Sequence, residues 1–371
     1  MYRKICIISL IATFMSGNAM AQTTHTPSSE TKQVVWGLGF GVNSFTRLPA
    51  DAQQTIPADV WRNSRCSSGL QIRFRTNAAS VVVDYGIEAK STSNNWFSDV
   101  GANGLDMYAR KSDGKWYWCH PTTRTVGEKF SYTQLDPDDA TYHNNGYEYR
   151  LYLPPFAVLT SLSITVNAGA SFEYIPVPQD KKPIVIYGTS IVHGAVCSRP
   201  GNTWTNIVSR NIPDRPIVNL GFSGTGRVEP EVVKVINEID AEIFVLDCLP
   251  NMSNAKLIPF IESRYLSAID TLRKYHPHTP ILLAEHIGYA DMGTNKTRKQ
   301  WVLDANSKLK NVYAILKKKG YKGIYYITRG ELGLDMSADI GDYIHPNDKG
   351  MYQYAKAYTQ KLKKISGRLG H

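Results

Sequence analysis

The stretch that decides the fold is Ile184-Val-Ile-Tyr-Gly-Thr-Ser-Ile191, in which a short apolar run enters a Gly-Thr-Ser turn. An uninterrupted run of this length is typical of a parallel strand buried on both faces. Similar runs follow toward the C-terminus, and helical patterns separate them. They are Ile217–Leu220, Ile243–Leu246, Ile281–Ala284 and Ile324–Ile327. The sequence therefore predicts repeated β-α units that form a three-layer α/β domain with a parallel sheet.

The chain before this domain has a different pattern. Residues 34–177 show strand-like alternation, as in Leu70–Phe74, Tyr147–Leu153 and Leu162–Val166, without a long amphipathic helix. Many short strands with one buried face predict an antiparallel β-sandwich, jelly-roll-like in type. Because the Pro-rich stretch 176–183 reads as a linker, we place the sandwich at 34–177 and the α/β domain at 178–371.

The first 21 residues have the features of an export signal. Arg3 and Lys4 precede an apolar run at 5–14, and Ala19-Met20-Ala21 fits a cleavage site. We expect cleavage after Ala21 and a periplasmic or secreted mature protein. Residues 22–33 are polar and are expected to form a flexible lead-in. No later segment reaches the ~20 apolar residues of a membrane helix, so no membrane span is predicted.

Composition narrows the classes of protein further. The chain has 371 residues, of which 42% are hydrophobic and 20% charged, which indicates a globular protein with room for two domains. The net charge is +10, but the basic residues are spread along the chain instead of forming a stripe. We therefore predict no nucleic-acid partner. Nothing in the sequence indicates an oligomeric state.

Residues suited to nucleophilic catalysis follow the strands. Ser190 comes directly after the first strand of the α/β domain, where a helix start favours negative charge. Near the C-terminus, Asp342 and His345 stand on one predicted loop. A serine hydroxyl needs a base to take its proton, and an imidazole does so best when a carboxylate fixes its tautomer.

Two further turns supply candidate donors for an oxyanion. Asn219-Leu-Gly-Phe-Ser-Gly224 follows the second strand, and Asn251 lies just after the third. The N–H of Ser190, the N–H of a glycine and the Asn251 amide are expected to hold the negative oxygen. Gly224 is the favoured glycine, with Gly221 as the alternative.

In this order, Ser190, Gly224, Asn251 and the Asp342/His345 pair resemble the four blocks of the SGNH (GDSL-type) hydrolase family. The first block differs, with Gly-Thr-Ser-Ile191 for Gly-Asp-Ser-Leu, and the third ends in Cys-Leu-Pro-Asn251. Both variants resemble a two-domain subfamily whose N-terminal β-sandwich carries Gly-x-Asp-Leu-Tyr. Here that motif is Gly104-Leu-Asp-Met-Tyr108.

The resemblance implies a flavodoxin-like parallel sheet and an exported serine esterase that needs no metal or organic cofactor. Related two-domain enzymes imply removal of short, most simply acetyl, esters from carbohydrates, with a small-molecule or polysaccharide ester as substrate. A lipase or lysophospholipase acting on longer acyl chains is the alternative within the same class. A non-catalytic carbohydrate-binding protein on a hydrolase scaffold is the alternative from another class.

Other residues carry weaker predictions. Glu285 and His286 follow the fourth strand and are candidate substrate contacts, or else a structural pair. Cys197 and Cys248 are expected at the same edge of the sheet, either bridged or as two buried thiols. Three large side chains are candidates for the substrate cleft: Arg199, Trp204 and Arg298.

Overall fold

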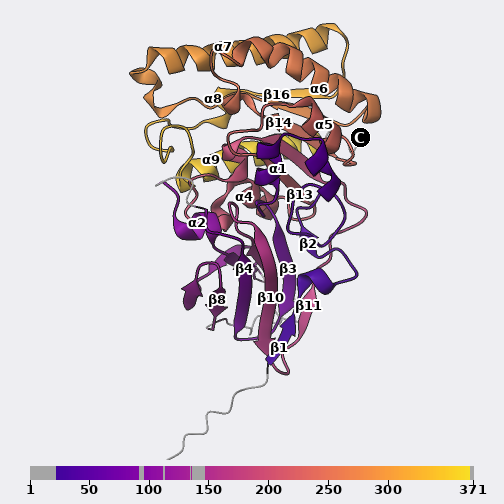
Figure 1. Ribbon diagram of the computed structural model, residues 1–371, viewed down its shortest axis with the longest axis vertical. Coiled ribbons are helices and arrows are strands. Elements are labelled where there is room, and N and C mark those ends of the chain that lie inside the picture. The colour runs from indigo at the N-terminus through magenta and orange to yellow at the C-terminus, as the bar shows by residue number, and fades with distance from the viewer. Residues whose placement is uncertain (1–21, 92–95, 112, 134, 136–146, 368–371) are drawn as a thin grey trace, which may run out of the picture.

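The parallel sheet predicted from the apolar runs lies at one end of the molecule and a β-sandwich at the other (Figure 1). This computed structural model describes residues 22–91, 96–111, 113–133, 135 and 147–367. The export signal predicted at 1–21 lies outside the described residues. Within them, no helix is long and apolar enough to cross a membrane.

Each predicted strand of the α/β domain is present. The sheet has the order β13-β12-β14-β15-β16, and all neighbours are parallel. This is the flavodoxin-like order, in which the chain starts in the second strand of the sheet and then runs both ways. The strands are β12 (Ile184–Gly188), β13 (Ile217–Gly221), β14 (Ile243–Asp247), β15 (Ile281–Ala284) and β16 (Ile324–Ile327).

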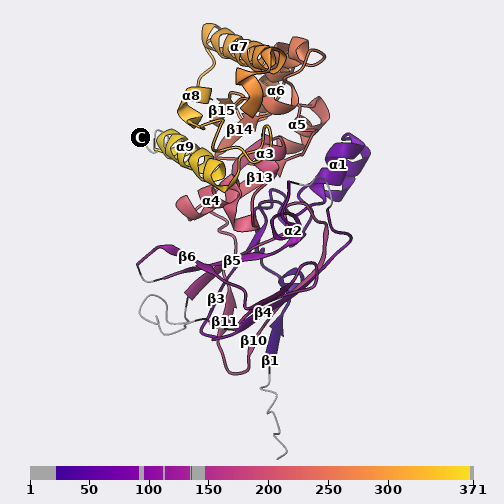
Figure 2. The ribbon, with the colours of Figure 1, turned by 90° about the vertical axis from the view of Figure 1, so that its left-hand side faces the viewer.

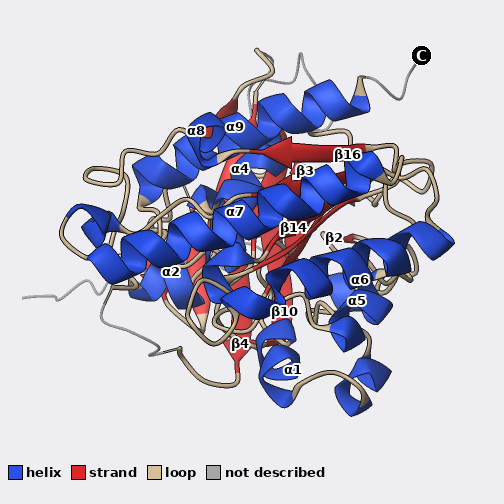
Figure 3. Ribbon diagram, turned by 90° about the horizontal axis from the view of Figure 1, so that it is seen from above, coloured by secondary structure: helices blue, strands red, loops and turns tan. Residues whose placement is uncertain are grey.

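Helices cover both faces of this sheet (Figures 2 and 3). On one face lie α5 (Pro230–Ile236), α6 (Ile261–Tyr275) and α7 (Lys296–Lys318), which bury one hydrophobic core against the strands. On the other, α4 (Trp204–Asn211) and α9 (Asp348–Ser366) enclose a second core. Because apolar side chains point to both sides of each strand, the strands carry the uninterrupted runs seen in the sequence.

The N-terminal region contains two antiparallel sheets, which confirms the β-sandwich. One has the order β1-β10-β4-β8-β7, and the other the order β11-β3-β9-β5-β6 with β2 beside β3. The first sheet consists of β1 (Gln22–His25), β10 (Leu159–Asn167), β4 (Val81–Ile87), β8 (Lys129–Tyr132) and β7 (Thr123–Thr125). The second consists of β11 (Phe172–Tyr174), β3 (Gln71–Thr76), β9 (Tyr147–Tyr152), β5 (Asp106–Arg110), β6 (Trp116–Cys119) and β2 (Val35–Trp36). The jelly-roll type stays a prediction.

Two expectations for this region were wrong. The polar segment 22–33 is not simply a flexible lead-in, because β1 pairs with β10 and the hydroxyl groups of Thr24 and Thr165 lie 2.9 Å apart. Strand β9 is buried on both faces instead of one. Its polar face meets the α/β domain, where Arg150 donates to the carbonyl of Ser209 at 2.7 Å.

The segment before β3 packs onto the α/β domain. It contains the short helices η2 (Ala50–Gln54) and α1 (Ala58–Ser64). Leu48, Ile56 and Val60 join the core formed by α5, α6 and the parallel sheet. The N-terminal domain therefore shares a hydrophobic core with the α/β domain and is not joined to it by the linker alone.

Candidate active site

Ser190 lies at the carboxyl end of β12, where the chain turns into the short helix α3 (Ser190–His193). The side chain of Thr189 caps this helix by accepting from the N–H of Ile191 at 3.3 Å. As the first helical residue, Ser190 has an N–H without a partner inside the helix. Its side chain is at the surface edge of the core, and the residue is 8% exposed.

Three side chains form a continuous chain of hydrogen bonds at this edge. The Oγ of Ser190 lies 2.7 Å from Nε2 of His345, and Nδ1 of His345 lies 2.6 Å from Oδ2 of Asp342. With Nδ1 protonated toward the carboxylate, Nε2 is left to accept the serine proton. The arrangement can therefore activate a serine oxygen for attack on a carbonyl carbon.

The Asp342 carboxylate is held in its charged form. Its other oxygen, Oδ1, accepts from the backbone N–H groups of Ile344 and His345, both at 2.8 Å. Burial alone raises the pKa of Asp342, but the hydrogen bonds from His345 and from this backbone outweigh burial and lower it to about 2. A carboxylate that stays ionised at neutral pH stabilises an imidazolium on His345.

The two candidate glycines have different surroundings. The N–H of Gly221 donates to Oδ1 of Asn219 at 2.9 Å, and a Cβ there would lie 2.2 Å from the backbone nitrogen of His193. Gly221 therefore allows a close backbone approach. Gly224 sits in an open turn with a φ of +72°, and no hydrogen bond among the described residues uses its N–H. Gly224 is thus the glycine able to donate to an oxyanion.

Asn251 ends the short helix η4 (Leu249–Asn251), which follows β14. In the amide orientation that satisfies its neighbours, its oxygen accepts from the N–H groups of Thr225 and Gly226, at 3.1 and 3.2 Å. This contact joins the Asn251 loop to the Gly224 turn. In this orientation the NH₂ group of Asn251 points away from the N–H groups of Thr225 and Gly226. The NH₂ group is therefore left to donate a hydrogen bond to an oxyanion.

The N-terminal domain contacts the loops that carry these residues, which the sequence analysis missed. Asn63, in α1, donates from Nδ2 to the carbonyl of Ser223 at 3.0 Å and to the hydroxyl of Thr225 at 3.2 Å. These residues flank Gly224. On α3, the His193 ring stacks on Phe156 with centroids 4.1 Å apart. No local motif marks such residues, because their partners are distant in the sequence.

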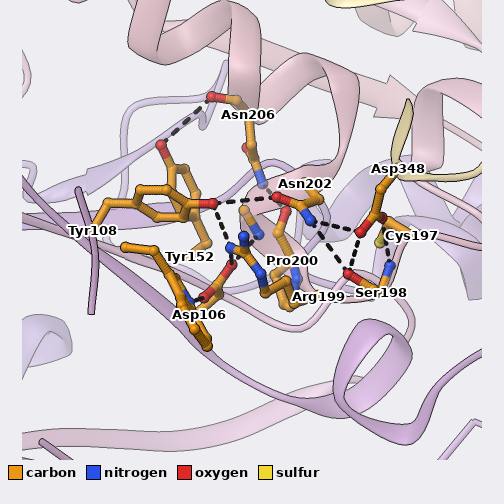
Figure 4. Close-up of polar contacts among 12 residues, drawn as sticks. Asp106, Tyr108, Tyr152, Cys197, Ser198, Arg199, Pro200, Asn202, Asn206 and Asp348 are labelled. Atoms are coloured by element: carbon orange, nitrogen blue, oxygen red, sulfur yellow. Dashed lines mark hydrogen bonds and ion pairs between the residues drawn. The ribbon is translucent and has the colours of Figure 1, made fainter. Parts of the chain in front are cut away.

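Figure 4 shows a second link, built on the Gly-x-Asp-x-Tyr motif of the sandwich. Asp106 accepts from Arg199 and from the N–H of Gly201, both at 2.9 Å. On the far side of the same loop, the N–H of Ser198 donates to Asp348 at 2.9 Å. Asp348 is the first residue of α9 and lies three positions after His345. The network therefore connects the sandwich to the loop after Ser190 and to the helix after His345.

The weaker candidates have mainly internal partners. Glu285 accepts from the Tyr326 hydroxyl at 2.9 Å and from the N–H of Arg329 at 2.7 Å. His286 is 0% exposed, and burial followed by the charge of Arg329 lowers its pKa to about 3. We leave both out of the proposed cleft. Trp204 is buried in the core beneath α9, Arg199 lies at the domain junction, and Arg298 lies on α7.

The four cysteines of the described residues are free and buried, so the possible Cys197–Cys248 bridge is not formed. The Sγ of Cys197 turns toward the carbonyl of Gly101 in the sandwich, at 3.8 Å. The Sγ of Cys248 turns toward the carbonyl of Tyr187, at 3.6 Å. In the same ranges, no group of three His, Cys, Asp or Glu side chains is placed to hold a metal ion.

A flavodoxin-like sheet with a serine, a histidine and an aspartate aligned at its carboxyl edge is an arrangement suited to a serine hydrolase, and the comparisons show that the class is carboxylic ester hydrolase. The chain belongs to the GDSL-like lipase/acylhydrolase family, whose model matches residues 181–363. A second model, for the N-terminus of SGNH-hydrolase-type esterases, matches residues 24–172. The resemblance seen in the sequence is thereby confirmed.

Solved structures agree with this assignment. A GDSL-like lipase from Bacteroides ovatus is 30% identical with a TM-score of 0.80, and the match covers 94% of this chain and 98% of that one. The salicylyl-acyltransferase SsfX3 of a tetracycline biosynthetic pathway is 18% identical with a TM-score of 0.71, and the match covers 93% of this chain and 98% of that one. The acetyl xylan esterase Est2A from Butyrivibrio proteoclasticus is 12% identical with a TM-score of 0.52, and the match covers 93% of this chain and 99% of that one. The last two show a shared fold. No curated protein matches the chain.

Proposed function

We propose that this protein is an exported serine esterase that removes short acyl groups, most simply acetyl, from carbohydrates. Ser190 is the nucleophile, His345 the general base and acid, and Asp342 the residue that orients His345. The observation that carries the proposal is the hydrogen-bond chain from Ser190 through His345 to Asp342, with distances of 2.7 and 2.6 Å. The leader at 1–21 is proposed to direct export and to be removed after Ala21.

In the first half-reaction, Oγ of Ser190 attacks the ester carbonyl carbon while its proton passes to Nε2 of His345. The carbonyl oxygen becomes an oxyanion, held by the N–H of Ser190, the N–H of Gly224 and the amide of Asn251. When the C–O bond breaks, the imidazolium returns its proton to the leaving alcohol, and an acyl-serine remains.

In the second half-reaction, water replaces the alcohol. His345 takes a proton from this water as its oxygen attacks the acyl carbon, and the same donors hold the second oxyanion. The bond to Ser190 then breaks and Oγ takes the proton back from His345. The products are a carboxylic acid and the regenerated serine.

Two observations support a carbohydrate ester over a long-chain lipid. The segment after β15 that approaches the site is polar, and its Asp291 and Arg298 side chains are about one third exposed, at 32% and 33%. A polar rim suits a hydroxyl-rich substrate, whose specificity comes from hydrogen bonds. In addition, the structural neighbour from Butyrivibrio proteoclasticus is an acetyl xylan esterase.

The test combines a serine-directed fluorophosphonate probe with an ester panel. We expect the probe to label Ser190, and the Ser190→Ala variant to fold normally, resist labelling and hydrolyse no ester. Wild-type protein should release acetate from acetylated xylo-oligosaccharides and prefer p-nitrophenyl acetate to the octanoate.

Preference for the octanoate, with no acetate released from any acetylated sugar, would indicate a lipase. In that case, each additional buried CH₂ group adds about 0.8 kcal/mol of selectivity. Absence of both labelling and hydrolysis would indicate a carbohydrate-binding protein. Full turnover by the Ser190→Ala variant would contradict the mechanism itself.

A further inference from the structure

An exposed aromatic side chain stands between two of the triad residues in the sequence. Tyr343 follows Asp342 directly and precedes His345 by two positions, yet it is 48% exposed, whereas Asp342 and His345 have side chains that are 3% and 13% exposed. Scattered exposed aromatics are common and need no explanation. Tyr343 differs because it lies on the catalytic loop and its position is held from several sides.

Tyr343 is fixed by its neighbours. Its ring stacks flat on that of Tyr289, with centroids 6.0 Å apart and planes 9° from parallel. Its carbonyl accepts from the N–H of Ala290 at 2.8 Å. Tyr289 is itself anchored, since its hydroxyl lies 2.9 Å from Oγ of Ser253, two residues after Asn251. The stacked pair therefore spans the distance between the His345 loop and the Asn251 loop, on which the reacting groups are carried.

Charged and polar groups adjoin the same stack. The guanidinium of Arg298 lies 4.7 Å from the ring centroid of Tyr343 and 5.4 Å from that of Tyr289. Its Nη1 donates to Oδ2 of Asp291 at 2.8 Å, and Asn295 donates to the same oxygen at 3.0 Å. Because the guanidinium lies over one side of the two rings, this ion pair places donors and acceptors without excess charge beside the part of the Tyr343 ring that stays exposed.

This combination fits a sugar ring. A pyranose has a face of C–H groups that packs on an aromatic ring, and hydroxyls around its edge that bond to planar polar groups such as guanidinium and carboxylate. We propose that Tyr343, stacked on Tyr289 and flanked by the Arg298–Asp291 pair, is the platform for the sugar ring that bears the ester. The inference rests on the proposed function and specifies which residues recognise the alcohol side of the substrate.

The platform predicts a selective defect. Tyr343→Ala should lower kcat/KM for an acetylated xylo-oligosaccharide about tenfold, mainly through KM, which corresponds to about 1.4 kcal/mol. Hydrolysis of ethyl acetate, which has no ring to stack, should change less than about twofold, a range typical of a residue outside the chemistry. Tyr343→Phe keeps the ring and should retain activity on both substrates. Tyr352→Ala removes another exposed tyrosine, on α9, and is the matched control.

The outcomes distinguish a sugar platform from a purely structural role of Tyr343. If Tyr343→Ala slows both substrates equally, the tyrosine only supports the His345 loop and the platform is wrong. If it spares the acetylated sugar, the platform is also wrong, although the proposed function stands. Phenyl acetate serves as a third substrate with an aromatic alcohol. If Tyr343→Ala slows hydrolysis of phenyl acetate but not of the acetylated sugar, the surface binds aryl groups and the platform for sugars is wrong. If wild-type protein cleaves ethyl acetate but no acetylated sugar, the carbohydrate function fails and the platform fails with it.

Discussion

The carboxylate of Asp106 forms an ion pair with Arg199 at 2.9 Å, which joins the N-terminal sandwich to the loop that follows Ser190 (Figure 4). Asp106 is 3% exposed and also accepts from Nε1 of Trp118 at 2.7 Å. Burial raises the pKa of Asp106, although Arg199 and its hydrogen-bond donors act in the opposite direction. A buried carboxylate with three donors, from Arg199, Gly201 and Trp118, indicates a structural link between the two domains.

The same loop carries backbone strain close to the triad. Val196 has a φ of +68°, which a β-branched residue rarely adopts. Its side chain packs beside Gly341, where a Cβ would lie 2.4 Å from Cγ1 of Val196. Gly341 precedes Asp342. Such strain persists only where the surroundings impose it, and here the sandwich and the start of α9 hold the loop from two sides.

Breaking the Asp106 link should cost stability. Asp106→Asn leaves Arg199 without its carboxylate, and the free energy of unfolding should fall by up to about 3 kcal/mol in denaturant titration. Arg199→Gln in the same chain should restore part of this loss, since it removes the unpaired charge. If the double variant is as unstable as the sum of the single ones, the two residues do not act as a pair.

Removing Asn63 should affect catalysis more than binding. Asn63→Ala loses the contacts that hold the Gly224 turn, so we expect kcat for p-nitrophenyl acetate to fall about tenfold with little change in KM, less than the loss of an oxyanion donor itself. Asn211→Ala serves as the control, because Asn211 bonds to Thr359 on α9, at 3.2 Å. An equal fall in both variants would point to general destabilisation.

Asp342→Asn should leave an impaired but active enzyme. The serine, the imidazole and the oxyanion donors remain, but the tautomer of His345 is no longer enforced, so kcat should fall about 10²- to 10⁴-fold.

The lowered pKa of Asp342, about 2 against an ordinary 3.8, also stabilises the fold at higher pH. That contribution is present above pH 3.8 and is lost as the pH falls through about 2. The difference in the free energy of unfolding between wild type and Asp342→Asn should therefore become smaller as the pH falls from 3.8 to about 2. A difference that stays constant over this range would contradict the lowered pKa of Asp342.

Asp247 should produce the opposite pH dependence. It is fully buried at the end of β14, where it accepts from the hydroxyls of Tyr354 and Tyr358, both at 2.8 Å. Burial raises its pKa to about 6, and the two tyrosines only partly oppose this. A raised carboxyl pKa favours folding at low pH, and this contribution is lost as the pH rises from 3.8 through about 6. The Asp247→Asn variant should not show this loss of stability when thermal unfolding is measured from pH 4 to 7. If the unfolding temperatures of wild type and variant change in parallel with pH, the raised pKa of Asp247 is contradicted.

The cysteines give a chemical test of the structure. The sequence has five cysteines, of which Cys6 lies in the predicted leader. In native protein without the leader, we expect iodoacetamide to modify none of the other four, because their thiols are free and buried. After denaturation it should modify all four, with or without reductant. Burial raises the pKa of Cys197, which further suppresses its reactivity. A mass difference of two alkyl groups between the reduced and unreduced denatured samples would demonstrate a disulfide.

The sequence by itself determined the parallel sheet, the β-sandwich and the identity of the residues in the Ser190–His345–Asp342 chain. These features rest on local signals: apolar runs buried on both faces, period-two alternation, and side chains placed directly after strands, where the topology brings the loops to one edge. The preference for Gly224 over Gly221 rests on the family pattern and stays a prediction, although the N–H of Gly221 is occupied by Oδ1 of Asn219.

Only the tertiary structure decided how the two domains meet. Thr24 lies in a segment that is polar in sequence, yet it pairs in a sheet because the edge of β10 offers hydrogen bonds. Asn63 and Asp106 contact loops of the candidate active site that lie more than 90 residues away in the sequence. Tyr289 contacts Tyr343, which lies more than 50 residues away. Such contacts depend on packing between elements, for which hydrophobic periodicity carries no signal, so they become visible only when the chain is folded.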